Sequence, residues 1–208
     1  DNEYIKFIIE IASVIPVEYI EGGPIENTND SIISEIVKFH KDLNFKVDLD
    51  GIFLKKPIFF HKENNLLIGV KSFLKEIDVL NDSESDQKEK IKFRGYFYAQ
   101  NKILYPRETN GISIKIKGVP IAPRYGYDTT FMQFPSYLQQ LFMNWISGEI
   151  YIDKGLEDAM NIDRASFRLT HPHYLALQDF VHRYIHDEII PLVYSLYNKG
   201  KDVRDKKK

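Results

Sequence analysis

The chain has no cysteine, which excludes disulfide bonds, thiolate metal sites and cysteine nucleophiles. No apolar run approaches the ~20 residues that a transmembrane helix needs. The first residues, Asp1, Asn2 and Glu3, are polar or acidic, whereas a secretory signal begins with positive charge. A formal net charge of -2 also argues against a broad nucleic-acid-binding surface. We therefore expect a cytoplasmic globular protein that does not bind membranes.

Phosphate-binding motifs are missing as well. The sequence has neither GxxxxGK[ST] nor a GxGxxG that follows a predicted strand. It does have 208 residues, of which 43% are hydrophobic and 28% are charged. This length and composition suit one large domain or two small ones with a normal core.

Apolar residues recur at helical spacing near both ends of the chain. Residues 3–14 are so rich in apolar side chains that we expect either a buried helix or a helix that leads out of a preceding domain. A short helix is expected over residues 32–39, and a long one over residues 171–198. Pro191 lies inside the long helix, so we expect a kink or a new start at that position. Residues 199–208 are predicted to form a basic, disordered tail.

The sequence pattern in the middle of the chain predicts β-strands. Asp50-Gly51 is a hairpin turn between two short apolar runs. Residues 112–117 alternate apolar and polar side chains, so we expect a half-buried strand with Lys115 and Lys117 on an exposed basic face. The remaining predicted strands are 45–49, 52–54, 57–61, 66–70, 74–80, 91–99, 103–105 and 145–152. Loops are expected at 81–90 and 118–128, and an irregular aromatic helix at 131–144. The expected fold is α+β: a mixed sheet with helices on one face and a long C-terminal helix.

The most informative stretch is residues 145–167, WISGEIYIDKGLEDAMNIDRASF. A strand leads into a polar loop, after which Asn161 or Asp163 is predicted to cap a helix that contains Arg164. An arginine in the first turn of a helix opposes the helix dipole. It is explained if an anion lies in front of both the arginine and the exposed backbone N–H groups. The alternative is a salt bridge from Arg164 to a neighbouring acidic residue, Glu157, Asp158 or Asp163.

Several of these segments resemble one known family. The strand ISGEI at 146–150 and the loop GLEDAMNIDR at 155–164 are similar to the middle domain of the ninety-kilodalton heat-shock chaperone and related GHKL-type ATPases. GYFY at 95–98 and GISIKIKGVPI at 111–121 are similar to the strands that open this domain. The likeness is greatest over residues 91–175, extends only loosely over 1–90, and is closest to a bacterial branch of uncharacterised chaperone-like ATPases.

The resemblance implies a ribosomal-S5-domain-2-like transducer fold, with residues 1–198 forming one middle domain. It also implies that Arg164 contacts the γ-phosphate of ATP, bound with Mg²⁺ by a preceding domain. Asn161 would then lie near the nucleotide, and Arg168 is a second candidate for a catalytic arginine. The family has a glutamine where Arg168 stands and a serine where Asp163 stands.

The resemblance further implies that the parent protein hydrolyses ATP. The sequence lacks the glutamate–asparagine helix and DxGxG motif that bind the nucleotide in this family, so the chain alone is expected to be inactive and to bind no cofactor. It also begins at Asp1, with no methionine, and is expected to be part of a longer protein. The expected partner is an upstream nucleotide-binding domain of the same chain. A protein client or a second copy is a further alternative.

The sequence is also compatible with two other functions. Six aromatic residues lie close in the chain to three basic ones, and such a face could bind a protein or a nucleic acid. They are Tyr96, Phe97, Tyr98, Tyr105, Tyr125 and Tyr127, with Lys115, Lys117 and Arg124. Ordinary packing of these aromatic side chains is the favoured interpretation.

The second alternative is a zinc-dependent hydrolase. His182 and His186 share a helix face and have Asp187 close by, so these three residues are candidate zinc ligands. However, Arg183 occupies the glutamate position of an HExxH motif. We expect no metal site, with His171 at the start of the last helix and the other two histidines at the surface.

Overall fold

The computed structural model describes residues 2–56, 66–80, 88–105, 109–121, 131, 143–163 and 165–205. Its centre is a five-stranded mixed sheet with the order β3-β4-β7-β5-β6. The strands are β3 (Ile68–Leu80), β4 (Lys88–Gln100), β5 (Gly111–Ile116), β6 (Val119–Pro120) and β7 (Ile146–Lys154). β5 and β7 run parallel, whereas the other neighbouring strands are antiparallel. The predicted α+β class with a mixed sheet is therefore confirmed.

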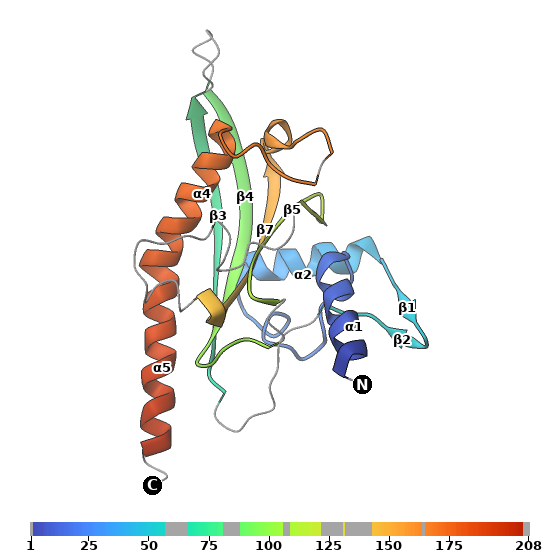
Figure 1. Ribbon diagram of the computed structural model, residues 1–208, viewed down its shortest axis with the longest axis vertical. Coiled ribbons are helices and arrows are strands. Elements are labelled where there is room, and N and C mark those ends of the chain that lie inside the picture. Colours follow the sequence, from blue (N-terminus) through green and yellow to red (C-terminus); the bar gives the residue numbers. More distant parts are fainter. Residues whose placement is uncertain are drawn as a thin grey trace.

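One face of the sheet packs against the C-terminal helices (Figure 1). Alternate residues of β4, including Phe93 and Phe97, point into this core because side chains on a strand alternate between faces. The helical part consists of α4 (Pro172–Tyr184), a π-helical segment η5 (Ile185–Ile189) and α5 (Ile190–Asp205). In Figure 1 they form one long rod along the sheet, so the predicted long C-terminal helix is confirmed.

The π-helical segment lies directly before Pro191, where an interruption was expected. Proline has no backbone N–H and clashes with the carbonyl four residues earlier. The Ile190 N–H donates to the carbonyl of Ile185, five residues back, so the helix is widened at this point rather than broken. α5 then continues to Asp205. The prediction of a disordered tail from residue 199 is therefore wrong for residues 199–205.

The opposite face of the sheet is covered by the N-terminal part of the chain (Figure 1). This part contains α1 (Asn2–Val14), α2 (Ser31–Leu43) and the short hairpin of β1 (Asp48–Leu49) and β2 (Ile52–Phe53). Asp30 caps α2 by accepting hydrogen bonds from the N–H groups of Ile32 and Ile33. Helices thus cover both faces of the sheet, whereas the sequence indicated one, because the polar side of the central strands is also buried.

Other elements differ from the expectations in detail. α1 is mostly exposed, so the first of its two expected forms, a buried helix, is wrong; Ala12 is its only buried side chain among the described residues. Residues 103–105 are not a strand, although Leu104 is buried. Every residue of β5 is buried, so the predicted exposed basic face is wrong for Lys115, whereas Lys117, after the strand, is exposed. The hairpin at Asp50-Gly51 is confirmed. The segments expected at 57–61, 122–128 and 132–142, and most of 81–90, lie outside the described residues.

Candidate functional site

The segment singled out in the sequence begins where β7 ends. Gly155 follows the strand with a φ of 92°, a left-handed conformation that favours glycine. A Cβ at this position would collide with the backbone carbonyl of Lys90. The chain can therefore turn sharply away from the sheet at residue 155, close against the start of β4. A short 3-10 helix, η4 (Glu157–Ala159), follows.

Residues 160–163 and 165–167 form the base and sides of a loop rather than the predicted helix. Met160 and Phe167 make an antiparallel bridge, and the N–H of Asn161 donates to the carbonyl of Ser166 at 2.9 Å. Phe167 is buried against Tyr174 of α4, which anchors the returning side of the loop. The described residues on either side of position 164 therefore do not form the expected helix N-terminus. The local hydrogen bonds and the burial of Phe167 stabilise a turn instead.

The predicted site residues have different positions around this loop. Arg164 lies outside the described residues. Asn161 donates through Nδ2 to the hydroxyl of Ser166 at 2.7 Å, so its side chain closes the base of the loop. Arg168 is exposed, and its guanidinium donates to the backbone carbonyl of Asp158. Asp163 accepts the N–H of Ala165 at 2.9 Å, a local turn that replaces the predicted helix cap.

A groove of about 620 Å³ separates this loop from the β5–β6 turn. Its lining includes Ile116, Lys117, Val119, Asn161 and Ile162. Two of these apolar side chains face solvent, since Val119 is 55% exposed and Ile162 is fully exposed. The loop therefore presents an apolar tip next to a groove, on a base that is fixed by hydrogen bonds.

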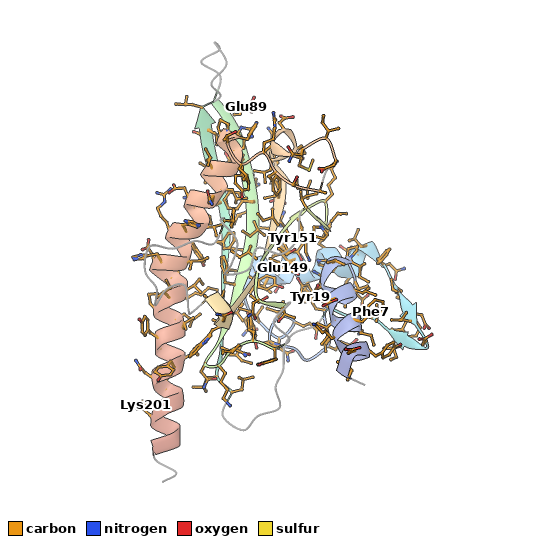
Figure 2. All side chains as sticks on the ribbon, viewed as in Figure 1. Phe7, Tyr19, Glu89, Glu149, Tyr151 and Lys201 are labelled. Atoms are coloured by element: carbon orange, nitrogen blue, oxygen red, sulfur yellow. The ribbon has the colours of Figure 1, made fainter. Side chains whose placement is uncertain are left out.

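A second cluster, not foreseen from the sequence, lies between the sheet and the N-terminal part of the chain. Figure 2 shows Tyr19, Glu149 and Tyr151 close together where α2 meets the sheet. We define the buried cluster by its seven members: Tyr19, His40, Lys56, Tyr96, Lys115, Glu149 and Tyr151. The strand register explains its assembly, since Tyr96 of β4 pairs with Glu149 of β7, and Lys115 of β5 pairs with Tyr151 of β7.

Glu149 is the centre of the buried cluster. Lys56 Nζ lies 2.9 Å from each of its carboxylate oxygens, and Lys115 Nζ lies 2.7 Å from Oε1. The hydroxyls of Tyr19 and Tyr151 donate to Oε2. Lys56 is 2% exposed, Lys115 0% and Glu149 5%. Two amines and one carboxylate are thus withdrawn from water together, which costs free energy unless their charges balance.

Burial also governs protonation in this cluster. Desolvation lowers the pKa of Lys56 well below its ordinary value; the Glu149 carboxylate opposes this shift and the Lys115 charge adds to it. Desolvation lowers the pKa of His40 to about 3, so its imidazole is neutral at pH 7. Burial, assisted by the charge of Glu149, raises the pKa values of Tyr19 and Tyr151 well above 10. These tyrosines therefore act as neutral hydrogen-bond donors.

Sequence reasoning missed this cluster for a definite reason. Lys115 was placed on an exposed face because polar residues alternate with isoleucine in its strand. The pattern identifies two faces but does not say that a second layer covers the polar one. The same alternation recurs on β7, where the polar positions are Ser147, Glu149 and Tyr151. Matching polar positions on two adjacent strands are the signal in the sequence that could have indicated a buried polar cluster. The contribution of Tyr19, His40 and Lys56 carries no local signature.

The histidines behave largely as expected. His171 is the N-cap of α4, and its ring accepts the N–H of His173. His182 is half-buried near the carbonyl of Phe131, whereas His186 is exposed beside Asp187. Within the described ranges, no group of three or more His, Cys, Asp or Glu residues is arranged to hold a metal ion.

The comparisons with known proteins do not assign the chain to a family. No protein-family model matches it, and no curated protein matches it. No helix in the described part of the chain is long and apolar enough to cross a membrane.

Proposed function

We propose that this chain is the middle, or transducer, domain of a cytoplasmic GHKL-type, chaperone-like ATPase, with a ribosomal-S5-domain-2-like fold. In this proposal it docks on an upstream nucleotide-binding domain that holds ATP with Mg²⁺. Arg164 reaches the γ-phosphate, and the nucleotide state is passed on through the loop at 155–168. The chain by itself hydrolyses no ATP, because the nucleotide site belongs to the other domain.

The observation that carries the proposal is the form of the loop around position 164. The bridge between Met160 and Phe167 and the bonds of Asn161 fix both of its ends. Ile162, two residues before Arg164, is fully exposed beside a groove. An exposed apolar side chain on a fixed loop is suited to docking on another surface, since docking removes its apolar area from water.

The chemistry of arginine suits the assigned role. In phosphoryl transfer, negative charge is spread over the oxygens of the transferred group, and a guanidinium offers several fixed donors to them. Asn161 and Arg168 already make hydrogen bonds within the loop, to Ser166 and to the carbonyl of Asp158. We therefore assign these two residues to positioning the loop that carries Arg164.

The test uses the full-length parent protein. Arg164→Ala is expected to lower kcat for ATP hydrolysis about 10³-fold or more, the scale of a lost arginine finger, while ATP binding is retained. Lys154→Ala removes the same charge from an exposed position at the end of β7 and is the matched control, with turnover expected to be unchanged. Unchanged turnover in Arg164→Ala would refute the mechanism.

Docking through the loop tip can be tested separately. Ile162→Ser makes the tip polar without touching the hydrogen bonds that close the loop. It is expected to weaken the association of the two isolated domains and to lower turnover in the parent. A variant that associates as tightly as the wild type would show that the groove and the loop tip are not the docking surface.

Part of the surface expected for the nucleic-acid alternative is buried. Tyr96, Tyr98 and Lys115 lie beneath the N-terminal part of the chain, so they cannot stack on bases or contact phosphates. Tyr105 and Lys117 are exposed, and residues 124, 125 and 127 lie outside the described part of the chain. Titration of the chain with single-stranded DNA and RNA at low and moderate salt is expected to show no salt-dependent binding. Binding whose affinity falls steeply with salt would favour the alternative instead.

A further inference from the structure

The buried cluster lies at the interface between the sheet and the N-terminal segment, which we define as residues 15–56. Figure 2 shows Tyr19 of this segment beside Glu149 of the sheet. Tyr19 and Lys56 lie side by side because the N–H of Lys56 donates to the carbonyl of Glu18 at 2.6 Å. Both contact Glu149 of β7, Lys56 through its amine and Tyr19 through its hydroxyl, and Lys115 of β5 contacts the same carboxylate. The cluster therefore connects both ends of the N-terminal segment to the sheet, next to the apolar contact that α2 makes with β4.

The two amines share one carboxylate oxygen. Lys56 Nζ and Lys115 Nζ lie 2.9 and 2.7 Å from the same Oε1 of Glu149. If both amines were ammonium groups, the one carboxylate would leave a positive charge uncompensated in an interior that excludes water. Burial therefore favours a neutral amine at one of the two positions, and it lowers the pKa of Lys56.

The seam between the N-terminal segment and the sheet is not filled completely. A cavity of about 400 Å³ lies between α2 and the sheet, and its walls include Phe39 on one side and Arg94, Tyr151 and Asp153 on the other. Tyr151 thus borders this cavity while its hydroxyl bonds to Glu149. The segment therefore contacts the sheet through the polar cluster and a small apolar core that includes Ile33, Ile36 and Leu104, with the partly open seam beside them. The apolar core under α4 and α5 is larger.

We propose that Lys56, Lys115 and Glu149 form a latch that holds the N-terminal segment on the sheet, and that the segment opens with the uptake of one proton by Lys56. In the closed state Lys56 is a neutral amine beside the Glu149 carboxylate, which balances the charge of Lys115. In the open state water solvates Lys56, which binds a proton and becomes an ammonium. This latch goes beyond the proposed ATPase function and does not depend on it.

Proton uptake on opening gives the latch a defined pH dependence. Between the lowered pKa of closed Lys56 and its ordinary value of 10.5, the open state binds one more proton than the closed state. The equilibrium constant for opening therefore rises about tenfold for each pH unit that the pH falls within this range. Below the lowered pKa both states are protonated and the dependence ends.

The other titratable groups around Lys56 set the useful pH range. They are Tyr19 from the N-terminal segment, His40 from α2, Tyr96 from β4, Lys115 from β5, and Glu149 and Tyr151 from β7. His40 takes up its proton on opening only below pH 6.5, its ordinary pKa, and the tyrosines lose theirs only above about pH 10. Opening is therefore measured from about pH 7 to about pH 10, where Lys56 dominates.

Hydrogen exchange of backbone amides measures the opening directly. The N–H groups of Leu54 and Lys56 bond to the carbonyls of Val47 and Glu18 within the N-terminal segment, so they report an opening in which the segment unfolds locally as it leaves the sheet. Amides of β4 near Phe97 report on the sheet. After division by the intrinsic exchange rate at each pH, the wild-type chain is expected to show an opening constant for the segment that rises about tenfold per unit fall in pH. The amides of the sheet should exchange more slowly.

Two lysine variants separate the latch from a general charge effect. Lys56→Met leaves Lys115 paired with Glu149, so the opening constant should lose its pH dependence. Lys55→Met removes the same charge one residue earlier, from a partly exposed ion pair with Glu21, and should keep the wild-type dependence. Lys56→Gln is a second variant if the methionine disturbs folding.

Three outcomes would overturn the proposal. The first is a wild-type opening constant that does not change with pH anywhere in the range. The second is a pH dependence that persists in both Lys56→Met and Lys56→Gln. The third is an N-terminal segment whose amides exchange only together with those of β4, because the segment would then have no separate opening.

Discussion

Glu149 is the single carboxylate that contacts both buried lysines among the residues described, which makes its charge a sensitive point of the fold. Glu149→Gln keeps the size of the side chain and its capacity to accept a hydrogen bond. It removes the negative charge that faces Lys56 Nζ and Lys115 Nζ at 2.9 and 2.7 Å. The variant leaves the charge of Lys115 uncompensated in an interior where both lysines are almost fully buried.

The expected cost follows from the general behaviour of buried ion pairs. Removal of one partner destabilises a protein by about 3–5 kcal/mol, because the remaining charge stays buried without compensation. This is a large part of the roughly 5–15 kcal/mol by which domains are stable. With a urea m-value of about 2–3 kcal/mol/M for a chain of this length, the unfolding midpoint should fall by roughly 1–2.5 M.

Equilibrium urea unfolding at pH 7, followed by far-UV circular dichroism, measures this change. Lys56→Met is the matched comparison, since it removes the second amine and leaves the pair of Lys115 and Glu149 intact. Its stability should equal or exceed that of the wild type. A loss below about 1 kcal/mol for Glu149→Gln, or an equal loss for both variants, would refute the assignment of Glu149 as the charge that balances the cluster.

Three further changes test other parts of the structure. The pKa of His40 is lowered from 6.5 to about 3, so the free energy of unfolding should fall as the pH drops from 6.5 towards 3, by up to roughly 5 kcal/mol. His40→Gln should remove this pH dependence, as measured by unfolding across the same pH range. Gly155→Ala forces a Cβ against the carbonyl of Lys90 at a positive φ and should lower the free energy of unfolding by about 2–5 kcal/mol. Gly22→Ala is the control, because Gly22 also has a positive φ but open space around it. This control should lower the free energy of unfolding by only about 1–2 kcal/mol in the same urea assay. Asp30→Ala removes the cap of α2 and should lower the free energy of unfolding by about 1 kcal/mol, with an unchanged m-value; no loss would contradict the capping role.

The elements that depend on a strong local pattern could be predicted from the sequence. β4, β5 and β7 follow from alternation, and the long C-terminal helix follows from apolar residues at spacings of three and four. The hairpin at Asp50-Gly51 follows from turn chemistry. In each case the residues that determine the element lie next to one another in the chain.

The errors arise where distant parts of the chain decide the outcome. A buried helix was one of the two expectations for α1 because it is apolar, but apolar content does not specify whether another layer covers a helix. Lys115 was expected at the surface, but the N-terminal segment brings Lys56 and Tyr19 over it. At residues 161–167, good capping residues predicted a helix, but the bridge between Met160 and Phe167 and the burial of Phe167 favour a closed loop.

The two lysines in the buried cluster are not explained by stability alone. Replacing a buried ion pair with apolar residues of similar volume is often neutral or stabilising, so a simple core at this position would hold the N-terminal segment at least as firmly. A second amine beside an already paired carboxylate adds a group that burial forces to be neutral. Such a group lowers the stability of the closed state relative to an apolar side chain and makes it depend on proton binding. The arrangement therefore fits a contact that must open, and Glu149 lies on β7, the strand that continues through Gly155 into the loop of Arg164.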